Sequence, residues 1–479
     1  MTTSNKLNNI EHFVVLMLEN RSFDHMLGYL YTEQGNVSPL GHAFEGLTGN
    51  ESNPDEHGNA VPVYKISEAD EHPYFMPGSD PGEGYFATNS QLFSDHQVAS
   101  PAPSATNQGF VTDYAYTLGW EGKSKGWNVM PGTTPSSIMG MYTPAMLPIL
   151  SGLAKGYAVC DHWYCSVPTE TLPNRAFATM ATSQGRMNDK DKQYTAPTIF
   201  NALANNGQSW AIYGYDAPPL SRASYTDITD ADNAHFGEFK DFQQAAQSNQ
   251  LANYTFLEPQ WGKGGNSQHP NYDVAKGEAF IQQVYDTLKN SAAWEKTLLI
   301  ITYDEHGGCY DHVPPPANAV APDSCTGMYG FDFTRFGPRV PTVLVSPLIA
   351  AGTVYRAEEG GTPLDHTAIL KTLQTRFDLA PLTKRDAAAP DIASVLTLDT
   401  ARTDDPLAGV KAPQSKQSFA VDDSADHLQQ LYVQSMESLP MEELHRESYP
   451  DALRHYKSSD QAIAYGRRRY EDYSKYKKR

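Results

Sequence analysis

The chain has 479 residues, and its hydrophobic content of 40% and aromatic content of 11% are those of a globular protein. Its 36 Lys and Arg against 56 Asp and Glu give a formal net charge of −20. This charge argues against a general nucleic-acid binder, which needs a net basic face, and against adhesion of the whole body to an anionic membrane. A small, soluble or zwitterionic substrate suits it better.

Neither a membrane span nor a secretory signal is visible in the sequence. No apolar run approaches the roughly 18 residues that a spanning helix needs, and no basic start with a long apolar stretch and cleavage site occurs. A cytoplasmic location, export without a cleavable signal and a mature secreted form therefore all remain open. The four cysteines match no common zinc-site spacing. Cys309 and Cys325 flank a Pro-rich loop, so either a bond between them or unpaired thiols would fit.

Predicted strands and helices alternate along most of the chain. In chain order they are a strand at 12–18, a long aromatic and Gly/Pro-rich stretch at about 29–134, a helix around 146–153, a strand at 157–159, a helix at 174–183, a strand at 209–213, a helix at 278–289, strands at 297–303 and 340–345, and a helix at 366–377. The stretch at 29–134 has little periodicity, and loops of that length are usually functional.

This alternation predicts an α/β domain over residues 1–400, with a mainly parallel central sheet flanked by helices and long loops over one edge. Apolar runs thin out after that, so residues 401–479 are expected to form a polar, helical C-terminal extension that packs on the domain or is partly mobile. Its end, 466–479, holds seven basic residues. A tail that attracts membrane or phosphate is the alternative, although it lacks the apolar face of an interfacial helix.

Three polar clusters fall where predicted strands end. ENRSFDH at 19–25 follows the first strand, DEHGG at 304–308 follows TLLIITY, and TLPNR at 171–175 precedes a helix. Ligands of open parallel sheets bind beyond the carboxyl ends of the strands. We therefore expect the three clusters to meet at one edge.

Carboxylate and amide oxygens in two of these clusters are the hard ligands that a divalent cation prefers. Glu19, Asn20, Asp304 and Glu305 supply them. Neighbouring residues of a regular strand point to opposite faces, so both members of each pair can reach one ion only where the strand breaks. The Asn20-Arg21 corner and Gly307-Gly308 provide such breaks. A hydrogen-bonded carboxylate cluster without metal is the alternative.

Thr171 has two interpretations. It precedes a helix with Pro173 in the first turn, so it could simply cap that helix. A hydroxyl at a helix N-terminus also faces free N–H groups that attract phosphate, and a neighbouring cation would lower its pKa and make it a nucleophile. Arg175, one turn later, would then contact phosphate oxygens.

The positions of the histidines and the absence of nucleotide-binding motifs limit the reactions that the sequence predicts. His96 and His269 lie in polar loop segments, while His306 and His312 flank the Gly307-Gly308 break and could support the site or contact phosphate. The sequence has no GxxxxGK[ST] loop and no GxGxxG opening a helix after a strand. ATP- or NAD-dependent chemistry is therefore not expected.

At these residues the sequence resembles a known family, which contains bacterial phosphocholine-type and non-haemolytic phospholipases C, plant non-specific phospholipases C and bacterial acid phosphatases. The matching stretches run in family order from residue 12 to about 385. They are ENRSFDH (19–25), NQGFV (107–111), CDHWYCSVPTETLPNR (160–175), EP (258–259), HPNYDVAKGE (269–278), ITYDEHGGCYDHVPPP (301–316) and RVPTVLVSPLI (339–349).

The resemblance implies an alkaline-phosphatase-like α/β fold with a metal-assisted phosphoesterase site. Carried over by position, Thr171 is the nucleophile, and His96 and His269 contact phosphate, with one or the other protonating the leaving group. Asn20 would touch both metal and phosphate. The implied metal ligands are Glu19, Asn20, Asp304 and Glu305, and the residues expected directly behind them are Asp24, His306 and His312. A third phosphate-contacting histidine has no motif that places it.

The expected activity is metal-dependent phosphoester hydrolysis through a phospho-threonine intermediate, carried out by a phospholipase C that cleaves phosphatidylcholine-type lipids to diacylglycerol and a phosphorylated head group. An acid phosphatase and a non-catalytic phosphate- or choline-binding protein are the alternatives, and a sulfatase is disfavoured because C-x-P-x-R is absent. The expected cofactor is one divalent ion (Ca, Mg, Mn or Zn), and transient contact with a membrane surface is open. Aromatic residues could cage choline or merely cover the sheet edge: Tyr74, Phe75, Tyr85, Phe86, Trp120 and Trp127.

Overall fold

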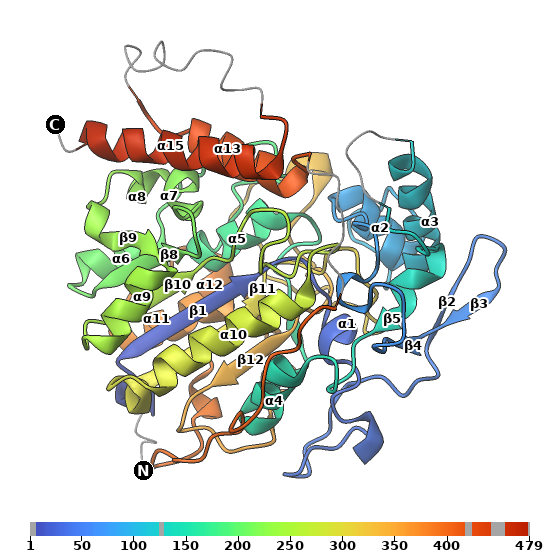
Figure 1. The fold of residues 1–479 in the computed structure, drawn as a ribbon, viewed down its shortest axis with the longest axis horizontal. Coiled ribbons are helices and arrows are strands. Elements are labelled where there is room, and N and C mark those ends of the chain that lie inside the picture. The colour runs from blue at the N-terminus through green and yellow to red at the C-terminus, as the bar shows by residue number, and fades with distance from the viewer. Residues whose placement is uncertain (1–5, 124–128, 417–423, 442–455, 478–479) are drawn as a thin grey trace.

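The computed structural model describes residues 6–123, 129–416, 424–441 and 456–477, and an eight-stranded sheet forms its centre (Figure 1). In spatial order the strands are β13 (Thr353–Val354), β6 (Ala158–Cys160), β12 (Thr342–Val345), β11 (Thr297–Tyr303), β1 (His12–Leu18), β10 (Tyr254–Leu257), β8 (Trp210–Gly214) and β9 (Phe236–Glu238). Only β12 runs antiparallel to its neighbours in this sheet. The predicted mainly parallel α/β architecture is confirmed.

The two central strands, β1 and β11, determine where the site lies. Both are almost entirely buried, which is why their sequences read as continuous apolar runs rather than as an alternation. They pair in parallel from His12 opposite Thr297 to Leu18 opposite Tyr303. The residues that follow the two strands therefore emerge side by side at one edge of the sheet.

Helices cover both faces of the sheet (Figure 1). One face carries α4 (Pro148–Gly156), α9 (Phe239–Gln247) and α10 (Val274–Lys289), and the other carries α5 (Thr171–Met180), α6 (Ile199–Asn205) and α11 (Thr367–Phe377). The remaining short helices are α1 (Phe23–Leu27), α7 (Ser221–Ser224), α8 (Thr226–Thr229) and α12 (Lys384–Ala388), and the short strand pairs are β2 (Ser52–Pro54) with β3 (Ala60–Pro62), β4 (Tyr64–Lys65) with β5 (Gly140–Met141), and β7 (Trp163–Tyr164) with β14 (Leu364–Asp365).

The stretch at 29–134 is more regular than its sequence predicts. It contains two packed helices, α2 (Tyr85–Phe93) and α3 (Phe110–Glu121). The consecutive residues Thr88, Asn89, Ser90 and Gln91 of α2 are all buried, so the helix is enclosed on every side there and polar side chains take positions where a buried helix usually has apolar ones. That composition hides the helical period from a hydrophobicity pattern.

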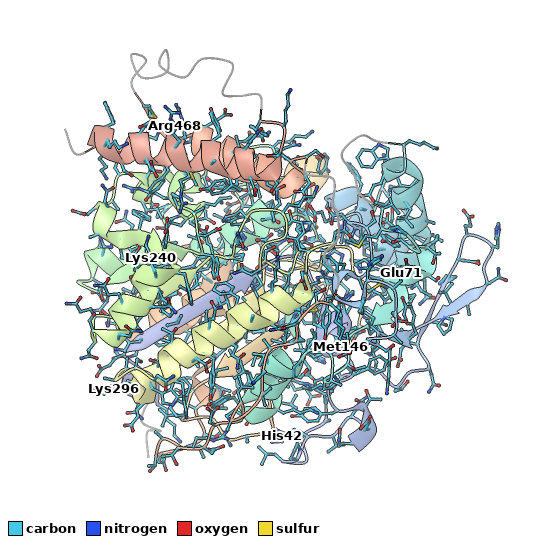
Figure 2. The ribbon with its side chains drawn as sticks, in the orientation of Figure 1. His42, Glu71, Met146, Lys240, Lys296 and Arg468 are labelled. Atoms are coloured by element: carbon cyan, nitrogen blue, oxygen red, sulfur yellow. The ribbon has the colours of Figure 1, made fainter. Side chains whose placement is uncertain are left out.

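Two helices of the C-terminal extension lie side by side across the outside of α7 and α8 (Figure 1). They are α13 (His427–Glu437) and α15 (Ser459–Lys477). Arg222 of α7 is buried and donates to the Tyr470 hydroxyl of α15 at 2.8 Å, which ties the two layers together. In the basic segment of α15, Arg468 lies on the outer side (Figure 2). The division between a 1–400 domain and a 401–479 extension stays a prediction.

All four cysteines are free thiols. Cys309 is buried and Cys325 is exposed, so the bond that their spacing permits is not formed. Among the described residues, no helix has both the length and the apolar character needed to cross a membrane.

Candidate active site

The ends of β1 and β11 bring four side chains with oxygen ligands together, as the sequence predicts. Glu19, Asn20, Asp304 and Glu305 are all fully buried. Asp304 connects them, because its Oδ1 accepts hydrogen bonds from the backbone N–H of Asn20 at 3.1 Å and of Glu305 at 2.9 Å. Two neighbouring strands thus deliver one buried acidic cluster.

Both strands break where the sequence predicts. Asn20 has a φ of 53°, and Gly307 and Gly308 have φ of 62° and 63°, which is the left-handed region. A Cβ on Gly307 would lie 2.1 Å from the Asn20 carbonyl oxygen, so the turn after β11 packs directly on the corner after β1. These turns allow successive residues to face the same cluster.

Thr171 is the first residue of α5, and its hydroxyl faces the acidic cluster. The N-cap position belongs to Glu170, so the capping interpretation of Thr171 is wrong. The Thr171 Oγ1 lies 3.4 Å from Glu19 Oε2 and 3.4 Å from Asn20 Oδ1. The carboxylate of Asp189 instead pairs with a free N–H group at this helix end, because it accepts a hydrogen bond from the Leu172 N–H at 2.8 Å.

Arg175 lies between the two strand ends and is 2% exposed. Its Nη2 bonds to Glu19 Oε1, and its Nε donates to Asp304 Oδ2 at 3.1 Å. Its Nη1 has no hydrogen-bond partner. Arg175 therefore holds two expected metal ligands in place, and a contact to phosphate through Nη1 stays a prediction.

The acidic cluster has the properties of a divalent cation site. Burial raises the pKa of Glu19 and of Glu305 well above the ordinary range, and the neighbouring Asp304 carboxylate raises both further. Glu305 Oε1 is buried and has no hydrogen-bond partner. A divalent ion would neutralise these charges and satisfy that oxygen, and all the available donors are the oxygens that such ions prefer.

The two predicted phosphate-contacting histidines lie in different surroundings. His269 is 3% exposed, and its Nε2 lies 3.9 Å from Glu83 Oε2 beside the cluster. His96 is exposed, and its Nδ1 is 2.8 Å from the Ser90 hydroxyl on the rim of a cavity. His269 thus lies beside the cluster and His96 does not, and a phosphate contact by either histidine stays a prediction.

Glu83 and His427 are site residues that sequence reasoning missed. The Asn20 side-chain amide donates to Glu83 Oε2 at 2.5 Å, and His427 Nδ1 lies 3.2 Å from Glu83 Oε1. Burial by itself would raise the pKa of Glu83, but hydrogen bonding and charge from His427 lower it to about 2. Burial would lower the pKa of His427, yet Glu83 and the nearby Asp189 raise it to about 10.

No motif marks either residue. Glu83 lies in a Gly- and Pro-rich loop, and His427 begins α13, more than 120 residues after the nearest predicted metal ligand. Asp426 caps α13 in a capping box with Gln429, which is the one local signal that a helix starts here. His427 is therefore our candidate for the third phosphate-contacting histidine, which no sequence motif places.

The residues expected behind the ligands divide into two groups. His306 is buried directly beside the cluster, with Nδ1 3.2 Å from Glu305 Oε2 and Nε2 2.7 Å from Gln91 Oε1. Asp24 and His312 belong to a separate network, in which His312 Nδ1 lies 2.6 Å from Asp24 Oδ2 and Arg339 donates to Asp24 Oδ1 at 2.8 Å. That network links α1 to the segment after Gly308, and among the described contacts it does not touch the four candidate ligands.

A cavity of about 500 Å³ opens beside Glu83. Its lining combines carboxylates with aromatic rings, and includes Asp80, Glu83, Asp113, Glu121, Glu170, Phe86, Tyr116, Trp120, His96 and His427. Burial raises the pKa of Asp113 and of Glu121 to about 7, and that of Glu170 to about 8.

The predicted aromatic residues are only partly at this cavity. Phe86 and Trp120 line it with exposed rings, and Tyr116 joins them from α3. Tyr74 and Phe75 are instead buried in the main core, and Tyr85 is buried in a smaller core cluster. Trp127 lies outside the described residues.

Comparisons with known proteins place the chain among named relatives. The family model described as the phosphoesterase family matches residues 10–380. Non-specific phospholipase C6 of Arabidopsis thaliana is 34% identical over 445 residues, which cover 88% of this chain and 80% of that protein. Phospholipase C A of Mycobacterium tuberculosis is 27% identical and covers 82% of this chain and 78% of that protein. Among solved structures, a protein in the alkaline phosphatase superfamily from Vibrio parahaemolyticus matches 52% of this chain and 65% of its own, with 13% identity and a TM-score of 0.32.

Proposed function

The chain belongs to the phosphoesterase family and is a phosphoric ester hydrolase, and we propose that it is a metal-dependent phospholipase C acting through a phospho-threonine intermediate. One observation carries this proposal. The Thr171 hydroxyl lies at a helix N-terminus and within 3.4 Å of two oxygens of the acidic cluster. A nucleophile, a cation site and phosphate-attracting N–H groups therefore converge at one point.

Glu19, Asn20, Asp304 and Glu305 would hold the divalent ion, which when bound polarises a phosphoryl group and favours ionisation of a neighbouring hydroxyl. In the proposed reaction the Thr171 Oγ1–phosphorus bond forms, the hydroxyl proton leaves to a carboxylate or water, and the phosphorus–glycerol oxygen bond breaks in line. His427, whose pKa is raised to about 10, donates a proton to the departing diacylglycerol oxygen. Water then cleaves the phosphothreonyl ester and releases the phosphorylated head group.

The lining of the cavity favours a phosphodiester substrate with a cationic head group. Its carboxylates repel a phosphomonoester, which carries up to two negative charges, more strongly than a diester, which carries one. Phe86, Tyr116 and Trp120 present exposed rings on the same wall, and quaternary ammonium groups favour aromatic faces. Phosphatidylcholine-type lipids combine both properties, and two of the relatives are named phospholipases C.

The test compares hydrolysis of p-nitrophenylphosphorylcholine with that of p-nitrophenyl phosphate, for the parent chain, Thr171→Ala and Thr179→Ala. Thr179 lies on the same helix and is also buried, so its variant controls for damage to α5. We expect the diester to be the better substrate, and Thr171→Ala to lose on the order of 10³-fold or more in kcat while its metal content stays unchanged. Near-full activity of Thr171→Ala would refute the nucleophile.

The same assay also decides between the three candidate functions. Strong monoester hydrolysis at acid pH with little diester cleavage would replace the phospholipase proposal with an acid phosphatase. Bound metal without turnover of either ester would favour a non-catalytic binding protein.

A further inference from the structure

A second cavity adjoins the cavity beside Glu83 and differs from it in charge. It has a volume of about 480 Å³, and its lining residues are Tyr85, Phe86, Gln97, Val98, Ala99 and Tyr329. Among the described residues, none that lines this second cavity carries a charge, whereas several carboxylates line the first. Phe86 lines both, so the two cavities meet at its ring. We call the second one the uncharged cavity.

Exposed aromatic rings form one wall of the uncharged cavity. Phe86 is 41% exposed and Tyr329 is 48% exposed, and their ring centroids lie 4.6 Å apart. Tyr85 stacks on Tyr329, with 5.5 Å between the centroids and 14° between the ring planes. Contiguous apolar surface that stays open to water around a cavity is typical of a ligand-binding groove.

Polar side chains hold two of these rings in place. Asn188 donates its side-chain amide to the Tyr329 hydroxyl at 2.9 Å, and Arg335 Nη2 donates to the Tyr85 hydroxyl at 3.2 Å. Tyr329 also has a φ of 59°, a conformation that bulky residues rarely adopt. The wall is therefore fixed before any ligand arrives, which lowers the entropy lost on binding.

One short segment connects this wall to the helix end that carries Thr171. Asn188 contacts Tyr329, and the next residue, Asp189, accepts a hydrogen bond from the Leu172 N–H at 2.8 Å. The uncharged cavity is thus joined to the candidate active site in two ways, through the shared ring of Phe86 and through this segment.

A phospholipid cleaved at Thr171 has acyl chains to accommodate as well as a head group. The cavity beside Glu83 does not suit them, because hydrocarbon packed against ionised carboxylates strips those groups of water. The uncharged cavity offers aromatic and aliphatic surface, on which hydrocarbon is more stable than in water.

We propose that the uncharged cavity binds an acyl chain of the phospholipid substrate, with Phe86 between the chain and the head group. The identity of this ligand rests on the proposed function, because a phosphomonoester without acyl chains has nothing to place there.

Chain binding is measured without turnover. The probes are butyl-, hexyl- and octylphosphonocholine, in which a carbon–phosphorus bond replaces the ester that is cleaved, and Kd is read by calorimetry below the concentration at which they form micelles. For the parent chain we expect Kd to fall about fourfold for each added methylene.

Ala99→Trp fills the cavity from an exposed position, so it leaves the core untouched. We expect it to reduce the fall in Kd to less than about twofold per methylene. Ala60→Trp is the matched control, because Ala60 is also exposed but belongs to β3 and lines neither cavity. It should keep the chain-length dependence of the parent.

A second variant covers a folding failure of Ala99→Trp. Tyr329→Ala removes part of the wall instead of filling the space, and it should raise the Kd of octylphosphonocholine by on the order of 10-fold while changing that of butylphosphonocholine less than about twofold. A parent chain whose Kd is independent of chain length, or variants at Ala99 and Tyr329 that both keep the parental dependence, would overturn the proposal.

Hydrolysis of p-nitrophenylphosphorylcholine, which has no acyl chain, separates the two proposals. Hydrolysis by a parent chain whose chain-length dependence survives in both variants refutes only the acyl-chain site. A chain-length dependence that both variants weaken, in a parent that does not hydrolyse this ester, supports the acyl-chain site and refutes the proposed function.

Discussion

Replacing Gly307 by Ala tests whether the contact between the two strand ends positions the metal ligands. The new Cβ would lie 2.1 Å from the Asn20 carbonyl oxygen, and real Cβ atoms approach no closer than 3.0 Å. The corner holding Asn20 must therefore move by about 1 Å, and a misplacement of that size costs about 100-fold in rate. The φ of 62° adds backbone strain of about 1–2 kcal/mol.

Gly58→Ala is the matched control, because Gly58 has a φ of 79° and no atom lies within 4 Å of the position that its new Cβ would take. It carries the backbone strain without the clash, so it should lose stability and keep its activity. The assay is kcat/KM for p-nitrophenylphosphorylcholine, with Tm measured on the same samples. If Gly307→Ala stayed within twofold of Gly58→Ala in kcat/KM, the packing of the two turns would not position the ligands.

Two further predictions concern charge. Arg339→Gln should lower the free energy of unfolding by denaturant by about 3–5 kcal/mol, because it removes the arginine that pairs with two buried carboxylates, Asp24 and Asp311. Lys296→Gln is the control at an exposed ion pair (Figure 2) and should lower it by less than about 1 kcal/mol. Equal losses would contradict this. Choline should inhibit more strongly as pH rises from about 5 to 8, because Asp113 and Glu121, whose pKa is raised to about 7 by burial, become charged over that range. Asp113→Asn with Glu121→Gln should weaken this dependence and leave the part due to Glu170, whose pKa is raised to about 8, and a dependence unchanged in the double variant would show that Asp113 and Glu121 do not contact choline.

The sheet and its polar edge could be predicted because local and global preferences agree there. The runs at 12–18 and 297–303 are long, apolar and flanked by polar residues, and the structure has β1 and β11 with the same bounds. Since parallel neighbours end at the same edge, the meeting of Glu19 and Asp304 follows from the fold class. The helix predicted at 174–183 begins three residues earlier in the structure, because Pro173 fits inside the first turn.

The other half of the site comes from segments without periodic signals. Glu83 lies in a loop before α2, a helix whose buried residues are largely polar, and His427 lies in the C-terminal extension. Their proximity is set by tertiary packing over a sequence separation of 344 residues, which spacing along the chain cannot report. His96 stands in a polar loop segment of the sequence, and its hydrogen bond to Ser90 shows how little a lone loop position says about its partners.

The charges explain why these distant segments meet. Buried carboxylates at the ends of β1 and β11 need cations, and Arg175 supplies one charge between Glu19 and Asp304. On the other side of Asn20, His427 supplies one charge to Glu83. Since burial makes unpaired charge expensive, the charge left over among Glu19, Asp304 and Glu305 favours an added cation at that place. In the proposed function a divalent ion supplies it, and the same ion stabilises the phosphoryl oxygens.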